Sequence, residues 1–297
     1  NDGVRVLAFS PDGRTLAEAN SKEVKLWELA TTAVRGRIGG SAPYPEAFRF
    51  SPDGRWLAMG AYDHGVHLFD VLNVRKVHSY AGHDHQVRGL DFSPDGRSLA
   101  SSSLDTTIMI WDVAGVTSRL PKTTSTPEAE YVVALWNGLR NSDPVIAYDA
   151  VRLLAQAPDK SLPFLRERLK PARDPDIKQV ESFLAKLDSP WFAERDEAKR
   201  ELERYGNEAE PALERYLAGN LSLEAQQRAE ALLARARAPL TDALLLQQVR
   251  ALEVLETIGT TEARSIMSNL AAGSRDARLT REARAALERL ERRGSGK

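Results

Sequence analysis

The chain has 297 residues, and its 41 Lys and Arg against 42 Asp and Glu give a formal net charge of −1. Such a chain has no overall field that would hold nucleic acid or an anionic membrane. The sequence contains no cysteine, which excludes disulfides, thiolate catalysis and cysteine-ligated metal centres. No stretch approaches the ~18 consecutive apolar residues of a membrane span. The compartment stays open, with a slight preference for the cytoplasm.

Composition divides the chain into two parts, in agreement with the roughly 150 residues of a typical domain. The first 120 residues hold 12 of the 19 glycines and all five histidines, and the remainder is dense in Ala, Leu, Glu and Arg. The first composition is typical of strands and turns, the second of helices. We expect a β domain at 1–117, a linker at 118–127, a helical domain at 128–293 and a flexible tail at 294–297.

The first part is an internal repeat. The sequence Phe-Ser-Pro-Asp-Gly-Arg begins at Phe9, Phe50 and Phe92, at steps of 41 and 42 residues. A second marker keeps this period: Leu-Trp-Glu at 26–28, Leu-Phe-Asp at 68–70 and Ile-Trp-Asp at 110–112. Ser-Pro-Asp-Gly reverses the chain, because proline presets φ and glycine tolerates a positive φ.

The strand predicted around 108–112 is apolar on both faces, since Met109 and Trp111 alternate with isoleucines. A strand with two apolar faces is typical of burial on both sides. We therefore expect this strand to lie sandwiched between neighbouring sheets.

The repeat resembles the WD40 family, whose period of 40–45 residues and Trp-Asp ending it shares. Gly82-His83, Asp105 and Trp111 match the family motif together in the third copy. The resemblance implies propeller blades, and a buried hydrogen-bond network that holds a blade through His83, Asp105 and Trp111. Three blades make an incomplete ring. Further blades upstream, association of several copies of the chain, or helices that cover the open edges would each account for the incomplete ring.

On a propeller of this family, the resemblance places the protein-contact residues in the loops at one end of the blades. The residues we expect there are Tyr44, Tyr62, His64, His85 and Leu104. His83 and His85 also form a His-x-His pair, but no third ligand of matching type lies near them in sequence. We expect neither a metal nor a cofactor, and we interpret His64 and His67 as turn and surface residues.

In the second part, Pro at the first helical position and Gly after the last one indicate where the helices begin and end. Apolar residues then recur at helical spacing on one side. The predicted helices are 128–140, 144–156, 159–169, 175–187, 190–205, 208–218, 222–237, 242–258, 261–272 and 278–292.

These helices form a weaker repeat of about three units, marked by similar segments at 161–165, 209–213 and 263–267. The turns are similar to those of HEAT and armadillo repeats. That resemblance implies units stacked into an α-solenoid whose exposed surface holds another protein.

We find no sign of an enzyme in the sequence. The helical part lacks His and Cys, and the chain has no phosphate loop, Gly-x-Ser-x-Gly elbow or His-Glu-x-x-His helix. The leading hypothesis is a non-catalytic scaffold that binds a protein partner and no nucleic acid, similar to bacterial multidomain WD40-repeat proteins. Two alternatives remain: a self-assembling, membrane-coat-like protein that associates through its unclosed blades, and the accessory tail of a larger enzyme.

Overall fold

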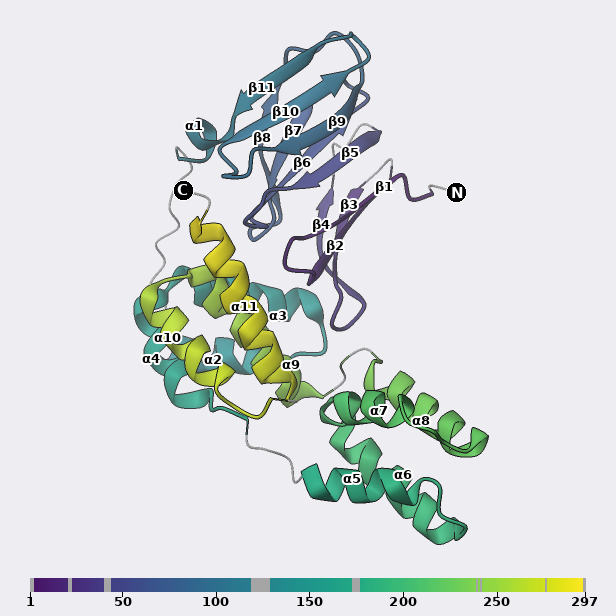
Figure 1. The fold of residues 1–297 in the computed structure, drawn as a ribbon. Helices are drawn as coiled ribbons and strands as arrows, with labels where there is room; N and C mark the ends of the chain where they lie inside the picture. Colours follow the sequence, from purple (N-terminus) through teal and green to yellow (C-terminus); the bar gives the residue numbers. More distant parts are fainter. Residues whose placement is uncertain are drawn as a thin grey trace.

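The computed structural model describes residues 3–20, 23–39, 44–118, 129–172, 177–238, 240, 242–275 and 277–295. Three small sheets come first and helices follow, with the helices gathered at one end of the sheets (Figure 1). From residue 119 on, the predicted linker lies outside the described residues. Among the described helices, none has the length and apolar character needed to cross a membrane.

Each sheet is an antiparallel meander in which strands adjacent in sequence are adjacent in space. The first two sheets have four strands and the third has three. The first contains β1 (Val6–Phe9), β2 (Thr15–Ala19), β3 (Glu23–Glu28) and β4 (Ala33–Gly39), the second β5 (Pro45–Phe50), β6 (Trp56–Ala61), β7 (Val66–Asp70) and β8 (Arg75–Tyr80), and the third β9 (Val87–Phe92), β10 (Ser98–Ser103) and β11 (Ile108–Asp112).

The Ser-Pro-Asp-Gly segments form the turn between the first and second strands of each sheet. In the second sheet, Gly54 N donates to Ser51 O over 2.8 Å, and Trp56 N donates to Ser51 Oγ over 2.9 Å. Gly54 has a φ of +72°, which only glycine adopts without strain. The same bonds recur at residues 10–15 and 93–98, so the repeated hexapeptide gives a repeated turn.

The three sheets pack face to face like consecutive blades. The middle sheet is covered on both sides, and every residue of β6 and β7 is buried. The expectation that 108–112 is sandwiched is wrong: Ile108 and Ile110 of β11 are 73% and 68% exposed. The third sheet is the last of the row, so one of its faces has no neighbouring sheet. Within the described part of the chain, no fourth strand pairs with the outer edge of β11.

The helices follow the predicted ranges to within a few residues, because Pro and Gly mark their ends. The exception is α1, a short helix capped by the Asp112 side chain, which lies outside every predicted range. The helices are α1 (Val113–Thr117), α2 (Ala129–Gly138), α3 (Pro144–Gln156), α4 (Pro158–Arg168), α5 (Ile177–Lys186), α6 (Phe192–Tyr205), α7 (Glu210–Leu217), α8 (Leu223–Ala236), α9 (Ala243–Ile258), α10 (Thr261–Ala271) and α11 (Arg278–Ser295), with a 3₁₀ turn, η1 (Gly206–Glu208), after α6.

Apart from α1, the described helices form two bodies that do not follow chain order. Helices α2, α3, α4, α9, α10 and α11 share one apolar core and form the six-helix body. Helices α5 to α8 share a separate core and form the four-helix body, further from the sheets (Figure 1). The four-helix body is thus an insertion between α4 and α9. It contains the second predicted repeat unit and also α5, the helix in which the first unit was predicted to end. The rest of the first unit packs directly on the third. A solenoid would instead stack each unit on the next in sequence.

Candidate protein-contact surface

The third blade has a chain of buried polar contacts. His83 Nδ1 lies 2.8 Å from Asp105 Oδ2, and His83 Nε2 lies 2.7 Å from Ser101 Oγ. Trp111 Nε1 donates to the same Ser101 oxygen over 2.8 Å. The carboxylate places the imidazole proton on Nδ1, so Nε2 accepts from the serine hydroxyl. The chain of bonds therefore fixes the loop before β9 onto β10 and β11.

Asp105 accepts several hydrogen bonds in this network. Burial alone would raise the pKa of its carboxyl, but bonds from Thr107, from the Asp84 backbone and from His83 hold the pKa well below its usual range. The carboxylate therefore stays charged and keeps the turn between β10 and β11 closed.

The other two blades replace this network in different ways. In the first, Glu18 stands where the third has Ser101, and Trp27 Nε1 donates to it over 2.6 Å. In the second, His67 is buried between Asp63 and Ser79. Our interpretation of His67 as a turn or surface residue is therefore wrong. The signal available in sequence was its position in a strand, four residues after an aspartate.

The five predicted contact residues lie in adjacent loops at one end of the blades, and we call them the contact face. Tyr44, Tyr62 and Leu104 are each about half exposed. The Tyr44 and Tyr62 rings meet edge to face with centroids 6.1 Å apart, and the His64 and His85 rings stack at 5.8 Å. Exposed aromatic side chains of this kind are enriched at protein interfaces.

Charged side chains border the contact face at the starts of the inner strands, and sequence reasoning missed them. Glu46 pairs with Arg88 over 2.8 Å and with Arg5 over 3.7 Å. Arg5 also lies over the Tyr44 ring, 5.0 Å from its centroid. These residues come from three different blades, which explains why sequence spacing gave no signal for them. Together they give the aromatic cluster a polar rim.

The six-helix body packs against the opposite end of the first and second blades. Arg250 of α9 donates from Nε and Nη2 to the two carboxylate oxygens of Glu28, each over 2.8 Å. Its Nη1 donates to the carbonyls of Leu139 and Asn141. Burial alone would raise the pKa of Glu28, but the bonds and charge of Arg250 lower it below its ordinary value. This buried, bidentate pair fixes the first blade to the helices.

Two further arginines of the first blade reach the same helices. Arg35 donates to Glu253 over 2.8 Å and stacks on the Tyr148 ring, 3.9 Å from its centroid. Arg14, at the first Ser-Pro-Asp-Gly turn, donates to Glu256 over 2.8 Å. The helices therefore occupy this end of the first blade and reach the second, where Tyr148 Oη donates to the Val71 carbonyl over 3.2 Å. The contact face is left open.

The described residues of the contact face form no catalytic or metal-binding arrangement. No group of three or more His, Cys, Asp or Glu among the described residues is placed to hold a metal ion. The histidines of the face contact each other, and His83 belongs to the blade network. What these residues offer is an aromatic surface with a charged rim.

Comparison with known proteins locates the repeats. The family model "WD domain, G-beta repeat" matches residues 44–70 and 74–112. WD repeat-containing protein VIP3 of Arabidopsis thaliana is 34% identical over 101 residues, which are 28% of this chain and 31% of that protein. The solved structures of U3-55K and of the RRP9 WD40 repeats each match with 22% identity and a TM-score of 0.37, over 38% of this chain and 36% of theirs. The chain thus spans about a third of the length of these relatives.

Proposed function

We propose that this chain is a non-catalytic scaffold that binds a protein partner on its contact face, because residues 44–70 and 74–112 match WD40 repeats, and WD40 repeat proteins act as protein-interaction scaffolds. The exposure of Tyr44, Tyr62 and Leu104 beside the stacked histidines carries the proposal. The helices hold the other end of the blades, so the contact face is the end available to a partner.

The test is a comparison of proteins retained by immobilised chain variants. The double variant His64→Ala with His85→Ala is expected to lose retained proteins, because it removes the stacked pair from the middle of the face. A matched control, Arg75→Ala with Lys76→Ala on outer strand β8, is expected to retain them. Equal retention by all three chains, measured by quantitative mass spectrometry, would refute the contact face.

Self-association is a second candidate, favoured by the open third blade. Ile108 and Ile110 are exposed on β11, and apolar surface next to an unpaired strand edge promotes association. We expect light scattering of the wild-type chain to show a mass above 32.8 kDa that falls to the monomer value in Ile108→Lys with Ile110→Lys. A concentration-independent monomer would remove this candidate.

Several finer predictions remain proposals. They are the domain boundaries 1–117, 118–127, 128–293 and 294–297, the HEAT-like character of the helices, and the accessory role in a larger enzyme. The likeness to bacterial multidomain WD40-repeat proteins is not shown by the relatives above. The packing of the first repeat unit on the third argues for a helical support of the blades over a linear solenoid.

A further inference from the structure

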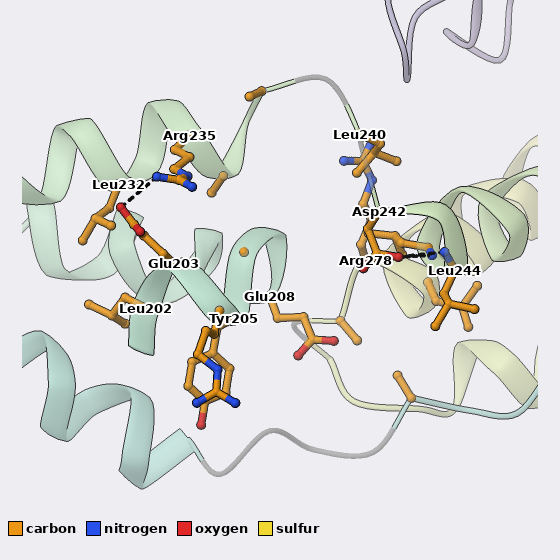
Figure 2. A pocket seen from close by; sticks show the side chains of 18 of the residues that line it. Leu202, Glu203, Tyr205, Glu208, Leu232, Arg235, Leu240, Asp242, Leu244 and Arg278 are labelled. Atoms are coloured by element: carbon orange, nitrogen blue, oxygen red, sulfur yellow. Dashed lines mark hydrogen bonds and ion pairs between the residues drawn. The ribbon is translucent and has the colours of Figure 1, made fainter. Parts of the chain in front are cut away.

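The cleft between the two helical bodies, of about 830 Å³, is lined in part by charged groups that bind one another (Figure 2). Glu203 pairs with Arg235 over 2.9 Å, and Asp242 accepts from the Leu244 backbone N–H at the start of α9 over 2.8 Å. The blades differ from this cleft. The first and third sheets, at the two ends of the row of blades (Figure 1), each expose large apolar side chains on the side that faces away from the middle sheet.

The outer face of the first sheet is built from alternate residues of its strands. Leu7 and Phe9 of β1 are 57% and 65% exposed. The register places Leu16 opposite Phe9 and Trp27 opposite Leu16, and residues directly opposite each other share a face. We call these four residues the phenylalanine face. Glu18 lies among them and accepts from Trp27 Nε1 over 2.6 Å, so covering the face would leave this carboxylate with its partner.

The outer face of the third sheet carries a different apolar set. It contains Ile108 and Ile110, the exposed residues of β11, and Ala100, which lies directly opposite Ile110 on β10. We call these three residues the isoleucine face. The exposure of the side chains on both faces shows that the helices of the described chain leave them free.

The two faces correspond to the halves of a joint that forms inside the chain. The repeat and the strand register identify the positions of the phenylalanine face in the second sheet and those of the isoleucine face in the first sheet. All of these residues are buried, and they share one apolar core. They are Phe48, Phe50, Leu57 and Phe69 in the second sheet, and Ala17, Val24 and Leu26 in the first.

The same joint forms a second time, between the second and third sheets. Here the side that corresponds to the phenylalanine face belongs to the third sheet, and the side that corresponds to the isoleucine face belongs to the second. The buried residues of this joint are Leu90, Phe92 and Leu99 on the third sheet, and Ala58, Val66 and Leu68 on the second. In both joints a phenylalanine-type face therefore covers an isoleucine-type face, and the row of blades leaves one face of each type open.

We propose that two copies of this chain associate through these blades, with the phenylalanine face of each copy covering the isoleucine face of the other. This inference rests on the self-association proposed above and identifies the second surface that takes part in it. Two copies supply six blades, which is within the range of roughly 4–8 blades in which propellers close. Both joints then form in one closed pair. An isoleucine face packed on its own copy would instead leave the phenylalanine face uncovered.

The test combines two variants of the full chain. Leu7→Lys with Phe9→Lys places charge on the phenylalanine face, and Ile108→Lys with Ile110→Lys places charge on the isoleucine face. Light scattering should give twice 32.8 kDa for the wild type and 32.8 kDa for each variant alone. An equimolar mixture should associate again, because each variant keeps the face that the other has lost. With one joint in place of two, the mixture should bind about 100-fold or more weakly than the wild type.

The matched control is Val145→Lys with Ile146→Lys, which changes two exposed apolar residues of α3 in the same way and should keep the wild-type mass. Because the substituted blade residues are exposed, their variants should melt near the wild-type temperature, which circular dichroism checks. Association of the mixture shows independently that both variants fold.

The outcomes separate this pairing from the other proposals. If the isoleucine-face variant dissociates and the phenylalanine-face variant does not, self-association stands and the pairing of unlike faces is wrong. A wild-type monomer at every concentration would overturn both, and would leave the contact face to its own test of retained proteins. A mixture that stays monomeric, or a wild-type mass that rises beyond twice 32.8 kDa with concentration, would overturn the closed pair.

Discussion

Ser101 shows how much one small side chain contributes to a blade. Its hydroxyl donates to His83 Nε2 and accepts from Trp111 Nε1, so one oxygen satisfies two rings. The neighbouring Ser102 faces the other side of the sheet and makes no hydrogen bond that joins such rings. The two serines therefore differ in consequence although they are adjacent in sequence.

We expect Ser101→Ala to lower the free energy of unfolding by about 2 kcal/mol, because each unsatisfied buried polar group costs ~1–3 kcal/mol. Ser102→Ala should change it by less than about 0.5 kcal/mol. Chemical denaturation followed by Trp fluorescence measures both. Equal effects of the two variants would contradict the role assigned to the Ser101 hydroxyl.

At the scale of elements, α9 joins the blades to the helices. Its apolar side chains enter the core of the six-helix body, and polar residues recur along it at intervals of three. Gln247 donates to the Trp136 carbonyl, Arg250 pairs with Glu28, Glu253 with Arg35 and Glu256 with Arg14. One helix thus positions two blade turns and its own neighbours.

Removing one partner of the buried pair between Glu28 and Arg250 should be strongly destabilising. We expect Arg250→Ala to cost about 3–5 kcal/mol of unfolding free energy, because Glu28 would stay buried without its counter-charge. The control Arg200→Ala removes an exposed pair with Asp196 and should cost less than about 1 kcal/mol. Thermal unfolding of both variants measures the difference.

Acid provides a second readout of the same pair. The folded-state pKa of Glu28 is lowered, so its stabilising contribution is complete above the unfolded-state pKa of about 4.3 and is lost as pH falls through the folded value. The Glu28→Gln variant should therefore lose less unfolding free energy than the wild type as the pH falls below about 4.3. If both chains lose stability with the same slope in that range, Glu28 is not the group that titrates.

At the scale of the whole molecule, local sequence signals predicted the strands, turns and helices, but they did not predict how these elements pack together. Proline and glycine mark turns and helix ends wherever they occur, so the three turns and ten of the helices were predictable. The exposure of β11 was not, because its apolar pattern is the same whether or not another sheet covers it. The pairs of Arg250 and Arg35 join residues more than 200 positions apart, and no sequence spacing indicates them.

The residues of the candidate site also differ in whether the sequence predicts them. Tyr44, Tyr62, His64, His85 and Leu104 could be placed together because each stands at a fixed position of a repeat. The charged rim of the contact face could not be predicted, because Arg5, Glu46 and Arg88 come from three different blades. The resemblance to stacked helical repeats suggested a different order of packing.

The position of the four-helix body between α4 and α9 has a consequence for synthesis of the protein on the ribosome. Domains generally fold as units during translation, from the N-terminus onward. The blades and α2 to α4 are made first, but α9, which carries the ion-pair partners of Glu28, Arg35 and Arg14, follows the whole of α5 to α8. The four-helix body has its own core and can fold while the earlier segments wait. During this interval Glu28 and Arg14 have no partner on α9, so this part of the base of the first blade stays hydrated until α9 emerges.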